Sequence, residues 1–213
     1  MRSGGFESMA DRKVWLRAMR NLRKKDRELK RIIDKHGVIT SNWGPNSPYE
    51  AIVDSFIFQQ ISGSAAEAIL KKFERLYGGR LPTPREFLRT PQQKIRSAGV
   101  SPQKYSYIKD LCERLVRNEL DLDGLRKLPD EEVIAILDDV KGIGRWTAEM
   151  FLMFSLKRVD VFPVDDLGIR NAMTNVYGFR HRPSREAMLK LSEKWAPYRS
   201  VASLYLWRSQ DAK

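Results

Sequence analysis

The chain has 213 residues, and its 39 Lys and Arg against 27 Asp and Glu give a formal net charge of +12, which favours a polyanionic partner. A hydrophobic content of 42% is enough for one large or two small globular domains, and no apolar run approaches the ~20 residues that a membrane span needs. A single cysteine, Cys112, excludes an internal disulfide and a cysteine-held metal centre, and with only His36 and His181 a histidine-rich metal site is not expected.

The N-terminal residues MRSGGFES have no apolar segment behind their arginine, so we expect no signal peptide there. Basic residues concentrate just after it: from Arg12 to Lys35, eleven Lys and Arg face three acids, a net +8. Such a surface can bind nucleic acid or simply be solvated, and the regular periodicity of this segment favours the solvated interpretation for most of its charges. One amphipathic helix is predicted, because apolar residues recur at helical spacing at Trp15, Met19, Leu22, Leu29, Ile32 and Ile33.

The rest of the chain predicts a succession of helices separated by glycine, proline and asparagine. In chain order we expect them at 49–61, 64–77, 84–88, from 91, from 102, 131–138, 145–156, from 165 or 166, from 184, and 200–208. The segment 158–164 has alternating valines but is short, which is more typical of an extended loop than of a strand. The prediction is an all-α protein with two helical lobes. Residues 1–45 would pack with the C-terminal segment 156–213, and residues 46–155 would form the central lobe.

The most informative segment is a glycine-bracketed turn between two predicted helices, Lys141-Gly142-Ile143-Gly144. Two glycines permit a tight turn with positive φ, and Ile143 would fill that turn from the core side. Backbone amides at the start of the next helix attract a phosphate without reading a base. The pattern resembles the helix–hairpin–helix DNA-binding element, with an ordinary helical hairpin as the alternative.

Further along, a proline-fixed loop delivers two acids, Asp165 and Asp166, to a predicted helix start. Together with the hairpin segment KGIGRWTAEMF, the segments PYEAIVDSFIFQQIS, DVFPVDDL, WAPYRS and LYLW resemble the helix–hairpin–helix DNA glycosylase superfamily. Within it, they are most similar to the 3-methyladenine DNA glycosylase II branch. The resemblance runs from Pro48 to Trp207. It implies a compact form that lacks the N-terminal β lobe of longer members, with an active-site cleft between two helical lobes.

The resemblance implies a monofunctional enzyme that flips an alkylated base, of the 3-methyladenine or 7-methylguanine type, out of double-stranded DNA and hydrolyses its N-glycosidic bond. It assigns catalysis to Asp166, and leaves Asp165 to cap the helix or hold the loop. The other positions it implies are a base pocket (Trp207, Trp146, Met150 and Phe58), a DNA wedge (Gln60 and Ile61) and DNA-backbone contacts (Lys141, Gly142, Gly144, Arg145 and Thr147). The alternatives are core positions for the tryptophans and an ordinary packed helix end for the wedge.

No cofactor is expected to be required, although the family hairpin usually holds a sodium or potassium ion on carbonyls that correspond to Asp138, Val140 and Ile143. The Schiff-base lysine of the bifunctional branches has no counterpart between Lys141 and Lys157, so lyase activity is not expected. The lone cysteine also excludes the iron–sulfur branch.

The expected protein is a monomer that acts on DNA, in a nucleoid or a nucleus, with no membrane partner. Two alternatives stay open. One is a glycosylase of the same fold for deaminated or etheno bases, since Met150 stands where longer members carry a tyrosine. The other is a non-enzymatic DNA-binding module, against which the acid pair at a DNA-facing loop argues.

Overall fold

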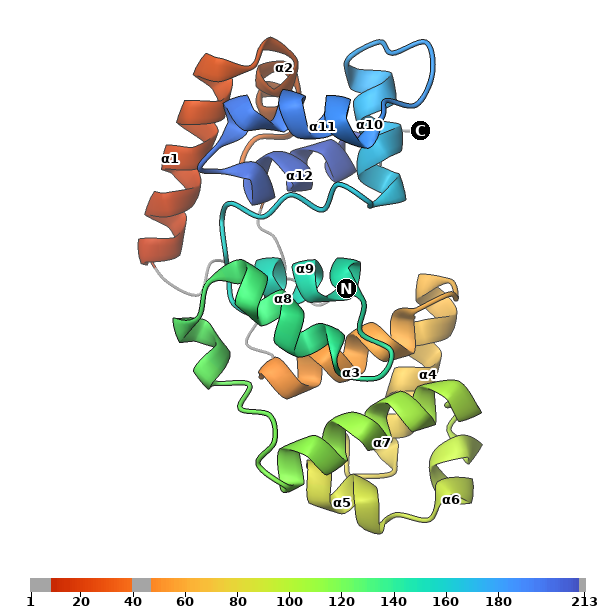
Figure 1. Ribbon diagram of the computed structural model, residues 1–213. Coiled ribbons are helices and arrows are strands. Elements are labelled where there is room, and N and C mark those ends of the chain that lie inside the picture. Colours follow the sequence, from red (N-terminus) through yellow and green to blue (C-terminus); the bar gives the residue numbers. More distant parts are fainter. Residues whose placement is uncertain (1–8, 40–46, 211–213) are drawn as a thin grey trace. The chain divides into compact units, whose positions relative to one another are not determined.

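The computed structural model describes residues 9–39 and 47–210 and is shown in Figure 1. Regular structure in these ranges is entirely helical, which confirms the all-α prediction. The eight N-terminal residues and most of the expected turn at 42–48 lie outside the described ranges. The elements are α1 (Met9–Lys25), α2 (Arg27–His36), α3 (Pro48–Phe58), α4 (Gly63–Arg75), α5 (Pro84–Arg89), α6 (Gln92–Ser97), α7 (Pro102–Val116), η1 (Gly124–Lys127), α8 (Asp130–Asp138), α9 (Arg145–Phe154), α10 (Leu167–Val176), α11 (Arg185–Ser192), η2 (Glu193–Trp195) and α12 (Arg199–Arg208).

The chain divides into two compact units. The terminal unit comprises the residues up to 45 and those from 152 onward, and the central unit comprises residues 46–151. The division falls within α9, after residue 151, whereas the sequence analysis placed it after 155. None of the described helices combines the length and the apolar content that a membrane crossing requires.

In the terminal unit, the C-terminal helix α12 lies at the centre and packs against α1, α2 and α10 (Figure 1). Its residues Val201, Ala202, Tyr205 and Leu206 are fully buried. N-terminal and C-terminal segments therefore share one apolar core, which also contains Trp15.

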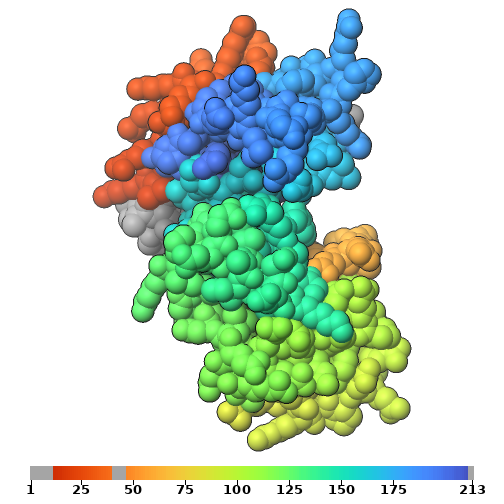
Figure 2. Space-filling model, viewed as in Figure 1, coloured from red at the N-terminus to blue at the C-terminus, as the bar shows by residue number. Residues whose placement is uncertain are grey.

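The basic N-terminal segment forms two helices, so the prediction of a single helix is wrong. α1 ends at Lys25 and α2 begins at Arg27, because the Asp26 carboxylate caps α2. Its Oδ1 accepts hydrogen bonds from the amides of Glu28 at 2.9 Å and Leu29 at 3.0 Å. Long side chains of the red and orange N-terminal segment project from the surface in Figure 2.

The Asp26 carboxylate is also the centre of a buried polar network. Its Oδ2 accepts hydrogen bonds from the Tyr177 hydroxyl and the Trp195 indole, both at 2.7 Å, and lies 3.0 Å from the Lys194 ammonium. Burial raises the pKa of Asp26, but the hydrogen bonds from Tyr177 and Trp195, with those from Leu29 and Lys194, lower it more. The pKa of Asp26 therefore lies below its ordinary value of 3.8.

In the central unit, α7 is the helix against which α3, α5 and α6 pack. Capping boxes at Ser47 and Thr83 begin α3 and α5, as expected for a hydroxyl followed three residues later by glutamate. α3 ends at Phe58, three residues before the predicted end at 61, and the chain then turns through residues 59–62 into α4.

We predict that Asp26→Asn lowers the free energy of unfolding by about 2 kcal/mol at pH 7, because a buried hydrogen-bonded charge is lost. The pKa of Asp26 is lower in the folded state. Its contribution to stability is therefore present above about pH 4 and is lost as the pH falls through the folded value. Denaturant unfolding at pH 7 and pH 3 measures this. The deficit of the variant should shrink in acid, and an equal deficit at both pH values would contradict the role of the ionised carboxylate.

Candidate active site

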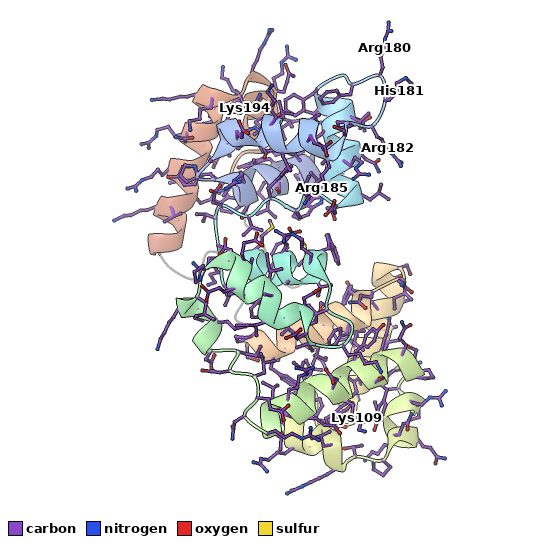
Figure 3. The ribbon with its side chains drawn as sticks, viewed as in Figure 1. Lys109, Arg180, His181, Arg182, Arg185 and Lys194 are labelled. Atoms are coloured by element: carbon purple, nitrogen blue, oxygen red, sulfur yellow. The ribbon has the colours of Figure 1, made fainter. Side chains whose placement is uncertain are left out.

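Asp166, rather than Asp165, caps α10. The amide of Ile169 donates to Asp166 Oδ1 at 2.7 Å, and the amide of Asp166 donates to the carbonyl of Pro163 at 3.0 Å. Of the two roles expected for Asp165, capping the helix or holding the loop, the first is wrong, because the turn after Pro163 brings the second acid to the helix start. Asp165 is exposed, and its Oδ1 lies 3.4 Å from Nε of Arg185, which is labelled at the start of α11 in Figure 3.

The oxygen of Asp166 that caps α10 also accepts a hydrogen bond from Nε1 of Trp207 in α12, at 2.8 Å. The Trp207 indole stacks on the ring of Phe154, with centroids 6.2 Å apart and planes inclined by 25°. Phe154 therefore lies against one face of the Trp207 indole. Sequence reasoning named Asp166 and Trp207 separately, and the structure brings them into direct contact.

A glycine lies beside the bond between Asp166 and Trp207. A Cβ atom added to Gly168 would stand 3.0 Å from Asp166 Oδ1 and 3.1 Å from two atoms of the indole. Both contacts are tighter than ordinary van der Waals packing, so a side chain here would displace the pair. A side chain two positions after Asp166 would therefore shift the Asp166 carboxylate or the Trp207 indole by a few tenths of an ångström.

The loop that leads to Asp166 is fastened by the first residues of α12. The guanidinium of Arg199 donates to both carboxylate oxygens of Asp160, at 2.9 and 2.8 Å. The buried Ser200 hydroxyl donates to the carbonyl of Arg158 at 2.7 Å and accepts from the amide of Val161 at 2.8 Å. Arg199 and Ser200 end the segment WAPYRS, which the sequence analysis quoted without giving these residues a role.

The hairpin turn has the features that the sequence predicts for it. Ile143 is 5% exposed and fills the turn from the core side. Gly142 has φ +87°, and a Cβ on it would overlap the ring of Tyr107, so this position needs glycine for its conformation and for its space. Gly144 is exposed, and a Cβ there would meet no atom within 4 Å. The backbone at Gly144 is therefore open to a ligand that approaches closely.

α7 supports the hairpin through two further side chains. The amide of Lys141 donates to Asp110 Oδ2 at 3.0 Å, and Arg114 donates to the same oxygen at 3.1 Å. Arg114 also donates to the carbonyl of Asp139 at 2.7 Å. These contacts have no local signal in the sequence, because the partners lie 25 and 31 positions apart.

Two of the expected DNA-backbone residues are engaged inside the central unit. The Arg145 guanidinium donates to both oxygens of Glu131, at 3.0 and 2.6 Å, and its Nε donates to the buried Glu149 at 3.2 Å. Hydrogen bonding to Arg145 lowers the pKa of Glu131. Thr147 is only 6% exposed. Lys141 and Arg145 flank the turn, and both are exposed. Lys141 differs from Arg145 in forming no ion pair with any described residue.

The expected pocket residues on α9 lie on one face of that helix. Trp146 and Met150 are one turn apart, and Phe154 follows at the same spacing. Trp146 is 42% exposed, so the alternative of a core tryptophan does not hold for it. Phe154 was not among the predicted pocket residues, although its helical spacing from Trp146 and Met150 was the available signal.

The expected wedge residues lie in the turn after α3. Ile61 is 38% exposed and Gln60 is also exposed, while Gln60 has φ +59°, a left-handed conformation that residues other than glycine seldom adopt. Phe58, the last residue of α3, is 39% exposed. These side chains are available at the surface, and the packed helix end considered as the alternative does not describe Ile61.

The candidate residues are divided between the two units. The terminal unit contains the carboxylate and its aromatic partners, Asp166, Trp207 and Phe154. The central unit contains the hairpin, the turn after α3, and Trp146 and Met150. Among the described residues, no group of three or more His, Cys, Asp or Glu side chains is placed to hold a metal ion.

Comparison with known proteins agrees with this geometry. Residues 53–197 match the family described as HhH-GPD superfamily base excision DNA repair protein. DNA-3-methyladenine glycosylase 1 of Schizosaccharomyces pombe is 36% identical over 80% of this chain and 78% of that protein. The crystal structure of DNA-3-methyladenine glycosidase from Bacillus halodurans aligns with a TM-score of 0.82 at 34% identity, covering 100% of this chain and 94% of that one.

A second solved structure, the Schizosaccharomyces pombe 3-methyladenine DNA glycosylase in complex with abasic DNA, aligns with a TM-score of 0.79 at 34% identity. The alignment covers 92% of this chain and 97% of that one. Family, sequence relatives and solved structures all coincide over the segment that contains the hairpin and Asp166. The chain belongs to the HhH-GPD superfamily of base excision DNA repair proteins.

Proposed function

We propose that this protein is a DNA glycosylase that hydrolyses the N-glycosidic bond of alkylated purines in double-stranded DNA. The observation that carries the proposal is the Asp166 carboxylate, which is fixed by the start of α10 and by Trp207. Relatives named as DNA-3-methyladenine glycosylases, one of them solved with abasic DNA, support the substrate and the DNA partner.

The reaction places positive charge on the sugar. The bond between C1′ and the base nitrogen breaks, its electron pair leaves with the base, and the deoxyribose acquires oxocarbenium character. The Asp166 carboxylate stabilises that charge, and water adds to C1′ with loss of a proton. A base alkylated at N3 or N7 already carries positive charge, so it leaves as a neutral molecule without needing protonation by an acid.

The aromatic side chains supply a place for the flipped base. Extrusion costs a few kcal/mol of stacking, and the cost is lower for a damaged base. A cationic base over an indole face gains roughly 0.5–2 kcal/mol. Half-buried Trp207, already stacked on Phe154, supplies such a face beside the carboxylate, and Trp146 on α9 is an exposed indole.

The hairpin backbone supplies the contacts with the DNA phosphates. Amides near Gly142 and Gly144 precede α9, whose N-terminus favours a phosphate. Lys141 adds one exposed charge, whereas Arg145 is held by Glu131 and Glu149 and serves the fold. With no lysine between Lys141 and Lys157, the enzyme releases the base by hydrolysis without a Schiff base.

We propose that the hairpin holds a sodium or potassium ion on the carbonyls of Asp138, Val140 and Ile143, of which the Val140 carbonyl also accepts a hydrogen bond from the amide of Ile143 at 3.0 Å. Two other carbonyls of the hairpin accept side-chain hydrogen bonds. Arg114 donates to the carbonyl of Asp139, and Gln59 donates to the carbonyl of Gly142. A monovalent ion there would fix the turn and add positive charge near the bound phosphate. The catalytic step itself needs no cofactor. We further propose that the protein acts as a monomer where genomic DNA is held, in a nucleoid or a nucleus.

We predict that Asp166→Asn reduces release of 3-methyladenine and 7-methylguanine from alkylated DNA by at least about 100-fold, because the charge opposite the oxocarbenium ion is lost. Affinity for a duplex with an abasic analogue should stay within a few-fold, since asparagine still caps a helix. Single-turnover release and fluorescence anisotropy measure the two quantities. Release at the normal rate by the variant would refute the catalytic assignment.

A panel of duplexes with one lesion each separates the remaining alternatives. Excision of 3-methyladenine and 7-methylguanine in preference to deaminated and etheno bases is the expected result. The reverse preference would move the substrate to those bases. Tight duplex binding with no release from any lesion would favour the non-enzymatic DNA-binding module, for which the exposed hairpin backbone at Gly144 is the supporting feature.

Trp207→Phe should slow base release about tenfold with little change in affinity for abasic DNA. Phenylalanine keeps a ring against Phe154 but lacks the indole N–H, so one hydrogen bond to the charged carboxylate is lost. Single-turnover rates at saturating enzyme measure the effect. A loss confined to binding, with an unchanged rate, would show that the N–H does not position the carboxylate.

Lys141→Gln should affect DNA binding, and Arg145→Gln should affect protein stability. Lys141→Gln should weaken binding of all duplexes and reduce the slope of log affinity against log salt by about 1. Arg145→Gln should leave that slope unchanged but lower the free energy of unfolding by about 1–2 kcal/mol, since buried Glu149 loses a charged partner. Salt titrations and denaturant unfolding of both variants check this, and a reduced slope for Arg145→Gln would place Arg145 on the phosphates instead.

A further inference from the structure

Gln59 connects the turn after α3 directly to the hairpin. Its backbone amide donates to the carbonyl of Ser55 at 3.2 Å and so closes the last turn of α3. Its side-chain Nε2 donates to the carbonyl of Gly142 at 3.0 Å, across 83 positions of sequence. The residue immediately before the expected wedge pair is thus bonded to the turn that would hold the DNA phosphate.

The backbone is constrained on both sides of this bond. Gln60 has φ +59° and Gly142 has φ +87°, so each partner segment adopts a left-handed conformation. For a side chain other than glycine this conformation costs free energy and persists only where the surroundings determine it. The hydrogen bond from the Gln59 side chain belongs to those surroundings, since it joins the residue before Gln60 to the hairpin.

Both segments also rest on α7. The buried Lys104 donates to the carbonyl of Ile57, at the end of α3, at 2.6 Å. The Tyr107 ring lies against Gly142, and its centroid is 5.5 Å from that of Phe56 in α3. α7 therefore sets the positions of the two segments, and the Gln59 side chain joins them to each other.

We propose that Gln59 is a positioning residue that couples the wedge turn to the hairpin, so that the hairpin's grip on a phosphate sets where Gln60 and Ile61 enter the duplex. The inference rests on the proposed function in its DNA-binding part only. Its physical basis is preorganisation: a turn that is ordered before binding loses less conformational entropy when it enters the gap left by a flipped base. The coupling should raise affinity for a duplex in which one base is missing from the stack, and should have little effect on affinity for an intact duplex.

The test compares two duplexes of the same sequence, one intact and one containing a tetrahydrofuran abasic analogue. Gln59→Leu keeps the size of the side chain and removes the donor. We expect it to lower affinity for the abasic duplex about tenfold and to leave affinity for the intact duplex within about twofold. The matched control is Gln93→Leu, at an exposed position of α6, which should change neither.

A double-mutant cycle with Ile61 tests the coupling itself. Ile61→Ala should reduce the preference for the abasic duplex, and Gln59→Leu should then cause no further reduction in that background. Should Gln59→Leu fail to fold, Gln59→Glu gives the same test, because it places an acceptor against the Gly142 carbonyl.

Three outcomes would overturn the proposal: an unchanged preference for the abasic duplex, equal losses on both duplexes, or additive effects of the two substitutions. All readouts are binding measurements. The role of Gln59 can therefore be tested even if the protein binds DNA and releases no base. Absence of DNA binding by the unmodified protein would instead refute the proposed function.

Discussion

One carboxylate oxygen connects the structure of the terminal unit to its proposed chemistry. Oδ1 of Asp166 accepts hydrogen bonds from the first turn of α10 and from the indole of Trp207, so the candidate catalyst is also the helix cap. Its neighbours maintain this arrangement: Gly168 leaves room for it, and Arg199 and Ser200 hold the loop that leads to it. A charge fixed in advance stabilises a developing cation without reorganisation at the moment of reaction.

The net charge of +12 suggests that basic side chains bind DNA, but a basic side chain of the central unit forms ion pairs within that unit. Arg145, the basic residue of the hairpin motif, joins α8 to α9 through Glu131 and Glu149. In the proposed function, the hairpin contacts DNA through its backbone amides and through the exposed Lys141 beside them. Much of the positive excess lies on α1 and α2, where long side chains project from the surface (Figure 2).

Patterns with local causes could be predicted from the sequence. The helices and the hairpin with Ile143 inside it follow from short-range spacing, whereas Asp166 as the candidate catalyst comes from the family resemblance alone. What could not be predicted depends on distant partners. The burial of the Asp26 carboxylate depends on its hydrogen bonds from Tyr177 and Trp195, which lie 151 and 169 positions away. The choice of cap between two adjacent acids depends on how the turn after Pro163 folds, which composition alone does not determine.

The central claim is that Trp207 acts on the reaction through Asp166. A kinetic double-mutant cycle measures this directly, with single-turnover release of 7-methylguanine from Trp207→Phe, Asp166→Asn and the double variant. We expect Trp207→Phe to slow release about tenfold when Asp166 is present and to have no effect when residue 166 is asparagine. Slowing by the same factor in both backgrounds would contradict it, because Trp207 would then act on the base independently of the carboxylate.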